Sequence, residues 1–518
     1  MKRGWSVVVC AAAALWAGAC SGGGGSSTTP PPPPNQFSNA DLSGQYAFSM
    51  SGSTVDQSTG VAVPFARIGS FTADGKGNIT AGTEDVNAVL AGGGASELSF
   101  TGGSYSVSGN GKGTLALTDS TGTINFSITL VSATNGYMIN MPTDGLSAGS
   151  GSFVKQNSNS FQISGVSGNY AFDLSGVDPS GTPESIVGQL SSNSNGVLGG
   201  FADDNDGAVV NGGVAGAASI SGTYFADGAQ PNDLASFGRG GFSIGGVAGV
   251  FYIVGPNEFM LMETSSGGTL LGTALLQSNI PTTAANLTNS FVYAMGGSGS
   301  GVPFTRGGKF AASGGNLTSV IVDNNNGGTI FDLGPTTGSY TVDPSGNGRG
   351  TITFNVSGFK DAFTYVFYMV SPTQAFVQDQ SLNVVEDGSM LAQGTGTISD
   401  STLAGNYALN WSGVTNTNAG VGEEDLVGFT TLGSEDLNGT VDINDFGAGG
   451  QATGITLTGT LKLSSDPTSR NAITFNLATP AATPISAFGY VAANNNILFM
   501  CTQKTSRIMV GVLTPQTP

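Results

Sequence analysis

A segment that recurs four times constrains this chain more than any other feature. It reads LSGQYAFSMSG at 42–52, VSGNYAFDLSG at 166–176, LTNSFVYAMGG at 287–297 and LAGNYALNWSG at 403–413. The aromatic residue at its fifth position returns at intervals of 124, 121 and 116 residues. Repeats of this length are domain-sized, whereas solenoid and propeller repeats run to about 20–50 residues. The sequence therefore predicts four tandem domains, each large enough to bury its own core.

The ends of the units repeat as well, which fixes the expected domain limits. The closing segments are GSFVKQ (151–156), GTALLQ (272–277), GSMLAQ (388–393) and GVLTPQ (511–516). From each of the first three closing glutamines to the next repeated aromatic residue is 14 residues. We expect β domains at 37–156, 165–277, 286–393 and 402–516.

Apolar residues alternate with small or polar ones inside each unit, as in VSGNYAFDLSG. This period of two is typical of a strand with one buried and one solvated face. Tyr170, Phe172 and Leu174 are expected to face the core, while Asn169, Ala171 and Asp173 point away from it toward solvent. Turns such as GNGKG (109–113) supply residues that adopt positive φ cheaply. About eight strand candidates per unit predict an all-β fold of four antiparallel eight-stranded barrels, since closure removes exposed edges. A β-sandwich is the alternative for each unit, and one large outer-membrane barrel is the alternative for the whole chain.

Composition excludes several classes of function. The 518 residues carry a formal charge of −19 and include no histidine. So acidic a chain repels phosphate backbones, and nucleic acid is not an expected partner. Without histidine, the usual general base, nucleophile partner and metal ligand are all missing. Of the 3 cysteines, only Cys501 lies outside the leader, so zinc and thiolate chemistry are not expected.

The first residues are typical of export. Lys2 and Arg3 precede an apolar run that is too short to span a bilayer, and small residues lead to Cys20. AGAC (17–20) resembles the lipobox of bacterial lipoproteins, although Ala17 stands where leucine is usual. That resemblance implies a signal peptide at 1–20 and a lipid on Cys20 that anchors the protein to the outer membrane or cell surface. Residues 17–19 also fit ordinary secretion. A Gly/Ser/Pro-rich tether at 21–36 favours the anchor.

Two family resemblances concern the repeat itself. The Gly-x-aromatic opening at Gly44, Gly168 and Gly405 resembles the Gly-x-Trp of the lipocalin-like (calycin) first strand, with tyrosine in place of tryptophan and Asn289 in the third unit. The whole chain resembles tandem-repeat bacterial lipoproteins with G-x-Y-A-F units. These resemblances imply architecture and location only.

An aspartate followed two residues later by an asparagine recurs in every unit, and this Asp-x-Asn segment could bind calcium. It is found at 85–87, 203–205, 323–325 and 442–444. Oxygen-rich loops bind calcium, and Asp203, Asp204 and Asp206 form the best candidate site. DLNGTVDIND (436–445) resembles a dockerin calcium loop but lacks its later ligands. The alternative is that these side chains cap turns. No cofactor other than calcium is expected.

Arg67 and Arg306 occupy matching positions in VPFARIGSF (63–71) and VPFTRGGKF (302–310). Matched arginines in a chain with few cations can hold an anionic ligand. The alternative is that each arginine pairs with a nearby carboxylate or covers a sheet face with its stem. The closing glutamines are expected to bond backbone or solvent.

These observations favour a non-catalytic protein with a binding or surface-structural role and an unidentified ligand. A polysaccharide, a small apolar ligand inside the barrels or a surface protein are the possible partners, besides the membrane reached through the lipid. A carboxylate-based glycoside hydrolase is the less favoured alternative. Its acidic residues would come from Glu84 and Asp85 or from the cluster at 423–425, but neighbours along a strand point to opposite faces. No catalytic residue is assigned.

Overall fold

The structure is a computed structural model of the chain. It describes residues 36–89, 94–207, 216–226, 233–356, 363–417, 420–446, 450–465, 470–478, 484–503 and 507–518. Strands dominate it, and the helices are single turns. The predicted all-β class is confirmed.

The first barrel begins after the short 3-10 helix η1 (Asn39–Asp41). Its strands are β1 (Ser43–Asp56), β2 (Val61–Asp74), β3 (Asn78–Ala88), β4 (Ser96–Ser99), β5 (Gly102–Val107), β6 (Lys112–Thr118), β7 (Thr123–Ser132), β8 (Asn135–Asn140) and β9 (Ser147–Lys155). Eight of them close a ring through the β2–β3 and β1–β9 pairings, and β4 pairs only with β3.

The second barrel follows the turns η2 (Ser158–Ser160) and η3 (Ile163–Val166). Its strands are β10 (Gly168–Val177), β11 (Pro183–Ser192), β12 (Val197–Asn205), β13 (Ala218–Phe225), β14 (Arg239–Ile244), β15 (Val247–Gly255), β16 (Glu258–Glu263) and β17 (Leu271–Leu276). The short helix α1 (Asp233–Phe237) precedes β14, and β10 pairs with β17 to close the barrel.

The third barrel follows η5 (Ala284–Asn286). Its strands are β18 (Ser290–Gly299), β19 (Val302–Ser313), β20 (Asn316–Asn326), β21 (Thr329–Val342), β22 (Arg349–Asn355), β23 (Phe363–Ser371), β24 (Gln374–Asp379) and β25 (Val384–Ala392). Again the first strand pairs with the last.

The fourth barrel follows α2 (Asp400–Leu403), and η6 (Ala493–Asn495) lies within it. Its strands are β26 (Gly405–Thr417), β27 (Gly420–Leu432), β28 (Asp436–Asp445), β29 (Gly450–Lys462), β30 (Asn471–Leu477), β31 (Ile485–Val491), β32 (Ile497–Cys501) and β33 (Arg507–Pro515). All four units are thus closed eight-stranded antiparallel barrels rather than sandwiches. The exact domain limits given above stay a prediction.

Each barrel encloses one apolar core, and the repeated opening strand supplies part of it. Tyr170, Phe172 and Leu174 are at most 2% exposed and pack among the inward residues of the second barrel. Aromatic pairs such as Tyr170 and Phe259, with ring centroids 4.8 Å apart, fill the interior. The predicted inward face of this strand is therefore confirmed.

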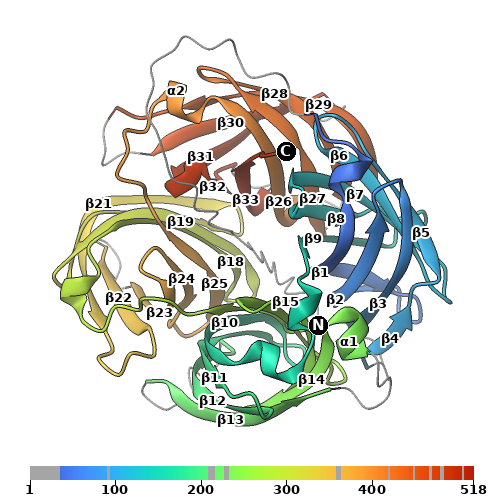
Figure 1. Ribbon diagram of the computed structural model, residues 1–518. Helices are drawn as coiled ribbons and strands as arrows, with labels where there is room; N and C mark the ends of the chain where they lie inside the picture. The colour runs from blue at the N-terminus through green and yellow to red at the C-terminus, as the bar shows by residue number, and fades with distance from the viewer. Residues whose placement is uncertain are drawn as a thin grey trace, which may run out of the picture.

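The four barrels lie around a common centre, so that the fourth returns to the first (Figure 1). Three further apolar clusters join neighbouring barrels across their outer faces. The opening and closing strands face this centre, where a cavity of about 50 Å³ is lined in part by Ser49, Ser150, Ser389 and Ser412. The chain is therefore a closed ring of barrels rather than a string.

Much of the outward face of the opening strands is buried. The expectation that Ala171 and Asp173 face solvent was therefore wrong, whereas Asn169 is exposed as expected. Ala171 is fully buried and Asp173 is 8% exposed, because the second barrel packs against the third at this face. Ala47 and Ala408 are buried in the same way in the first and fourth barrels. Small outward side chains let two sheets approach closely, so these positions form interfaces.

Within the described residues, none of the helices is both long enough and apolar enough to span a bilayer.

Candidate functional site

A charged pair joins each barrel to the next at the same place in the repeat. Asp85 in β3 accepts hydrogen bonds from Nε and Nη2 of Arg239 in the second barrel, at 2.8 and 2.7 Å. Tyr252 donates to the same carboxylate at 2.8 Å. The pair is buried, with side-chain exposures of 4% and 2%. Bidentate, charge-assisted hydrogen bonds of this kind fix the orientation of the two side chains as well as stabilising the contact.

An aspartate, an arginine and a tyrosine also meet at the next two interfaces. Asp203 of the second barrel binds Nε and Nη2 of Arg349 in the third at 2.7 and 2.8 Å, with Tyr368 as the additional donor. Asp323 of the third barrel binds Arg470 of the fourth, with Tyr490 in the tyrosine position.

At the closing interface, Asp442 of the fourth barrel binds Lys112 of the first at 2.7 Å. Lysine replaces arginine here, and Thr129 stands opposite Lys112 where the other barrels have tyrosine. The ring of four charged pairs is therefore complete.

The amide two residues after each aspartate holds the neighbouring barrel by its backbone. Asn87 donates to carbonyls of Glu263, Ser265 and Gly268, at 2.6–3.1 Å. The three counterparts donate to carbonyls of the following barrel: Asn205 to Asp379 and Val384, Asn325 to Cys501 and Arg507, and Asn444 to Asn140 and Ser147. The Asp-x-Asn segments thus lie in strands and join neighbouring barrels. The sequence instead suggests that they cap turns or bind calcium.

The closing glutamines make a third set of contacts between barrels. Gln156 donates to the carbonyls of Phe237 and Ile253 at 2.9 and 2.6 Å. The counterparts again reach into the following barrel: Gln277 to Asn347 and Met369, Gln393 to Val491, and Gln516 to Asn110 and Leu130. The repeated polar residues of this chain therefore hold the ring together.

The residues of the predicted calcium site point in different directions. Asp203 faces outward to Arg349, whereas Asp204 lies on the opposite face of β12 and Asp206 follows the strand. Burial and then the charge of Asp206 raise the pKa of Asp204 to about 6. No group of three or more acidic, cysteine or histidine side chains suited to a metal is found among the described residues. A calcium site here stays a prediction.

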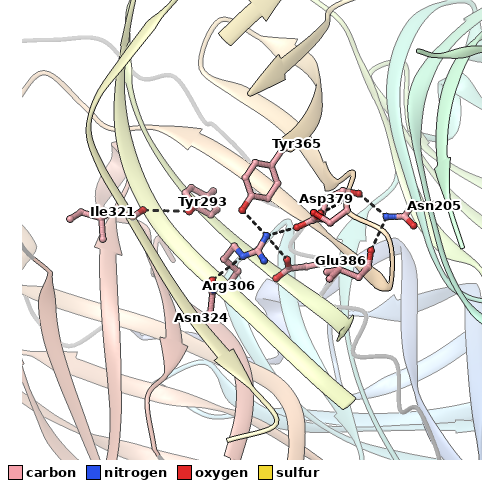
Figure 2. A network of polar contacts seen from close by, with 10 residues as sticks. Asn205, Tyr293, Arg306, Ile321, Asn324, Tyr365, Asp379 and Glu386 are labelled. Carbon is pink, nitrogen blue, oxygen red and sulfur yellow. Dashed lines mark hydrogen bonds and ion pairs between the residues drawn. The ribbon is translucent and has the colours of Figure 1, made fainter. Parts of the chain in front are cut away.

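Arg306 lies inside the third barrel and is 2% exposed (Figure 2). Its Nε donates to Asn324 at 2.9 Å, and its Nη1 contacts Tyr365, Asp379 and Glu386. The rings of Phe304 and Phe363 flank the guanidinium, each 4.9 Å from it. Burial raises the pKa of Glu386 to about 8 despite the nearby arginine. Arg306 is thus enclosed by its own barrel.

Arg67 occupies the same position in the first barrel but has different surroundings. Its Nη1 contacts both oxygens of the buried Glu84, at 2.8 and 2.7 Å. Burial raises the pKa of Glu84, and Arg67 opposes that shift. The arginine also lines a cavity of about 390 Å³ at one end of the barrel. Arg67 and Arg306 lie in different barrels and do not form one site.

The cavities inside the second and third barrels are small. The second barrel encloses about 20 Å³ among apolar side chains such as Phe172 and Phe251. The third encloses about 10 Å³ between Tyr293, Phe354 and their neighbours. Ligand pockets usually measure about 300–1,000 Å³, so these two interiors are packed cores.

The acidic cluster of the fourth barrel is divided between its two faces. Glu424 points inward to Arg507, with oxygens 3.0 and 3.1 Å from Nε. Glu423 accepts a hydrogen bond from Ser53 of the first barrel at 3.2 Å. Burial raises the pKa of Glu423 to about 8, and burial followed by the Glu423 charge raises the pKa of Asp425 well above its usual value. All three carboxyl groups are buried.

A further pair of carboxyl groups, those of the buried Asp173 and the half-buried Asp387, lies between the second and third barrels. Burial raises the pKa of Asp173 to about 7 and that of Asp387 well above its usual value, and the charge of Asp173 adds to the shift in Asp387. The backbone N–H of Thr273 donates to Asp173 at 3.0 Å.

Comparison with known proteins adds little. No protein-family model and no curated protein matches the chain. Solved structures similar to it include the isotype 1 transferrin binding protein B from serogroup B Neisseria meningitidis, at 10% identity and TM-score 0.21, covering 74% of this chain and 85% of that one. A double mutant of transferrin binding protein B from Haemophilus parasuis Hp5 has 9% identity and TM-score 0.21, covering 73% and 82%. TM-scores this low support no argument about the function of this chain.

The interface residues were visible in the sequence, but their role was not. The cation that meets each aspartate comes just before or at the start of a strand, at Lys112, Arg239, Arg349 and Arg470. A signal existed in the recurrence of one aspartate, one cation, one asparagine and one glutamine in every unit. Cys20 and the expected signal peptide at 1–20 lie outside the described residues.

Proposed function

We propose that this chain is a non-catalytic, lipid-anchored extracytoplasmic binding protein whose four barrels form one rigid support. The observation that carries this proposal is the use of the repeated polar residues. The Asp, Asn and Gln of every unit are bound to the next barrel, so they serve assembly rather than catalysis.

The acidic residues considered for glycoside hydrolysis support the same conclusion. Glu84 faces into the first barrel with Arg67, whereas Asp85 faces outward to Arg239. Glu423 and Asp425 are buried at an interface. A hydrolase needs two carboxyl groups that flank one bond of a bound substrate, and these pairs are separated by a sheet or enclosed.

Anchoring through Cys20 rests on the leader and the tether. The first described residues, Gln36 and Phe37, line an open groove with Asn406 and Phe429, where the first and fourth barrels meet. A lipidated tether entering there would hold the ring beside the membrane.

A purely structural role is the second candidate, and the packed interiors of the second and third barrels favour it. The same packing argues against apolar ligands inside those two barrels, because core side chains would have to move.

Two measurements test the proposal. Cys20→Ala should move the protein from the membrane fraction to the soluble fraction, and an unchanged distribution would contradict the anchor. A thermal-shift screen of residues 36–518 against polysaccharides, oligosaccharides, lipids and calcium should raise the melting temperature with at least one ligand. A melting temperature unchanged by every ligand would contradict a binding role and favour the structural one.

A further inference from the structure

The first barrel differs from the third at the matched arginine, and this difference creates a cavity. Phe126 pairs with the last residue of β8, as Tyr365 pairs with the last residue of β24. The strand register therefore places Phe126 in the position that Tyr365 has in the third barrel. By the same register, Asn140 stands in the place of Asp379.

Two further partners of the enclosed arginine are also replaced. The residue opposite Arg306 on the next strand is Asn324, whereas the residue opposite Arg67 is Val86. Glu386 pairs with Gly297, and the corresponding pair in the first barrel is Gly149 with Gly52. The first barrel therefore lacks a tyrosine hydroxyl, two carboxylates and an amide around its arginine.

Because these side chains are absent, some N–H groups of Arg67 lack a hydrogen-bond acceptor among the described residues. Its Nη1 is bound to Glu84, while its Nε and Nη2 have no hydrogen-bond partner among the described residues. The side chain is 16% exposed and borders the cavity of about 390 Å³. That volume lies within the usual range for small-molecule pockets.

The rest of the lining is both polar and apolar. Phe65, Ile124 and Leu146 provide apolar surface, and Gln57, Asn140 and Asp144 provide polar groups. This combination suits a ligand with an apolar face and a rim of hydroxyl groups, which can both donate and accept hydrogen bonds.

Charge selects between a neutral and an anionic ligand. Glu84 pairs with Arg67, which lines the cavity, and the exposed Asp144 lines it too. The chain as a whole carries −19. An anion would therefore meet no net positive charge, whereas neutral hydroxyl groups can accept from Arg67 and donate to Asp144.

We propose that the cavity at the end of the first barrel binds one or two units of a neutral saccharide, with Arg67 as the inner hydrogen-bond donor. The hydroxyl oxygens accept from the open guanidinium nitrogens, and the C–H face of the sugar packs against Phe65 and its apolar neighbours. A free disaccharide and the end of a longer glycan share this chemistry. This inference rests on the proposed binding role and names its site and ligand class.

The test uses isothermal titration of the full chain, purified as the soluble Cys20→Ala protein, with maltose, cellobiose, lactose and diacetylchitobiose. Glucuronic acid serves as the anionic comparison. Arg67→Ala removes the donor. Thr123→Trp fills the cavity from an exposed position that lines it. Thr114→Trp is the matched control, because both threonines are exposed strand residues whose hydroxyl pairs with one neighbouring hydroxyl at 2.9 Å.

We expect at least one neutral disaccharide to bind, with affinity reduced tenfold or more by Arg67→Ala and by Thr123→Trp and unchanged by Thr114→Trp. Titrating the matching polymer then shows whether glycan ends bind as the disaccharide does. Equal affinity for wild type and Thr123→Trp, tighter binding of glucuronic acid, or no binding of any saccharide would overturn the inference. If lipids or calcium bind while saccharides do not, the proposed binding role stands and this site fails. If nothing binds, both fail.

Discussion

The side-chain amide of Asn444 in the fourth barrel donates a 2.8 Å hydrogen bond to the backbone carbonyl of Asn140 in the first, 304 residues away. A second bond of 2.9 Å reaches the carbonyl of Ser147. No covalent linker joins these two barrels, so noncovalent contacts must close the ring. The pair Lys112–Asp442 and the contacts of Gln516 lie at the same interface.

Asn444→Ala should lower the free energy of unfolding by about 1–3 kcal/mol, since buried hydrogen-bonded groups lose their partner. Asn438→Ala is the matched control, because Asn438 lies on the same strand and is exposed. Its effect should stay within about 0.5 kcal/mol. Urea unfolding of both variants measures the difference, and equal midpoints would show that the closing contact contributes nothing.

The stability of the ring should fall as pH rises. The pKa of Asp173 is raised to about 7 in the folded chain, so the folded state keeps a proton that the unfolded chain loses near pH 4. The contribution of Asp173 to the free energy of unfolding is complete below about pH 4 and is lost as pH rises to about 7. Asp387 acts in the same direction.

Urea midpoints between pH 4 and 8 check this expectation. Asp173→Asn keeps the shape of the side chain without the titration, so its profile should be flatter than that of the wild type. Asp436→Asn, at an exposed position, should leave the slope unchanged. A wild-type midpoint that rises over this range would contradict the raised pKa of Asp173 in the folded chain.

The two matched arginines should differ in their importance for folding. Arg306→Ala removes the cation that contacts Asp379, Glu386 and Tyr365. It should cost about 3–5 kcal/mol, as is typical when one member of a buried ion pair is removed. Arg67→Ala should cost less, because Arg67 borders a cavity that water can enter. Denaturant unfolding of both variants checks the order, and the reverse order would contradict the enclosure of Arg306.

A single barrel should be less stable alone than in the ring. Residues 165–277 expressed alone would expose Val250, Tyr252, Met260 and Met262, which the first barrel covers in the full chain. Exposed apolar patches of this kind promote association. We expect a β-type circular dichroism spectrum, a lower melting temperature than that of the full chain, and self-association in sedimentation. A monomer as stable as the full chain would show that the interfaces do not stabilise the barrels.

The barrels could be predicted from the sequence, whereas the ring could not. Alternation in the opening strand marks Phe172 as inward, because a large apolar residue at every second position requires a core. The same pattern says only that Ala171 and Asp173 face the other way. Small and polar outward residues suit solvent and a close interface equally well, so a single strand does not distinguish them.

The candidate sites show the same limit. Asp203 stood out for its acidic neighbours, yet its partner Arg349 lies 146 residues further along the chain. Arg67 and Arg306 were found as a matched pair, but only the strand register shows which side chains surround each. Long-range partners of this kind follow from topology and not from local spacing.

Solution X-ray scattering of residues 36–518 tests the closed ring most directly. A compact body of this length should have a radius of gyration of about 23 Å. Four separate barrels in a row, each about 13 Å in radius of gyration, would instead exceed about 30 Å. A value near 23 Å, unchanged in high salt, is the result that the ring predicts. A value above about 30 Å would show that the barrels are strung along the chain and that the contact between Asn444 and Asn140 does not form.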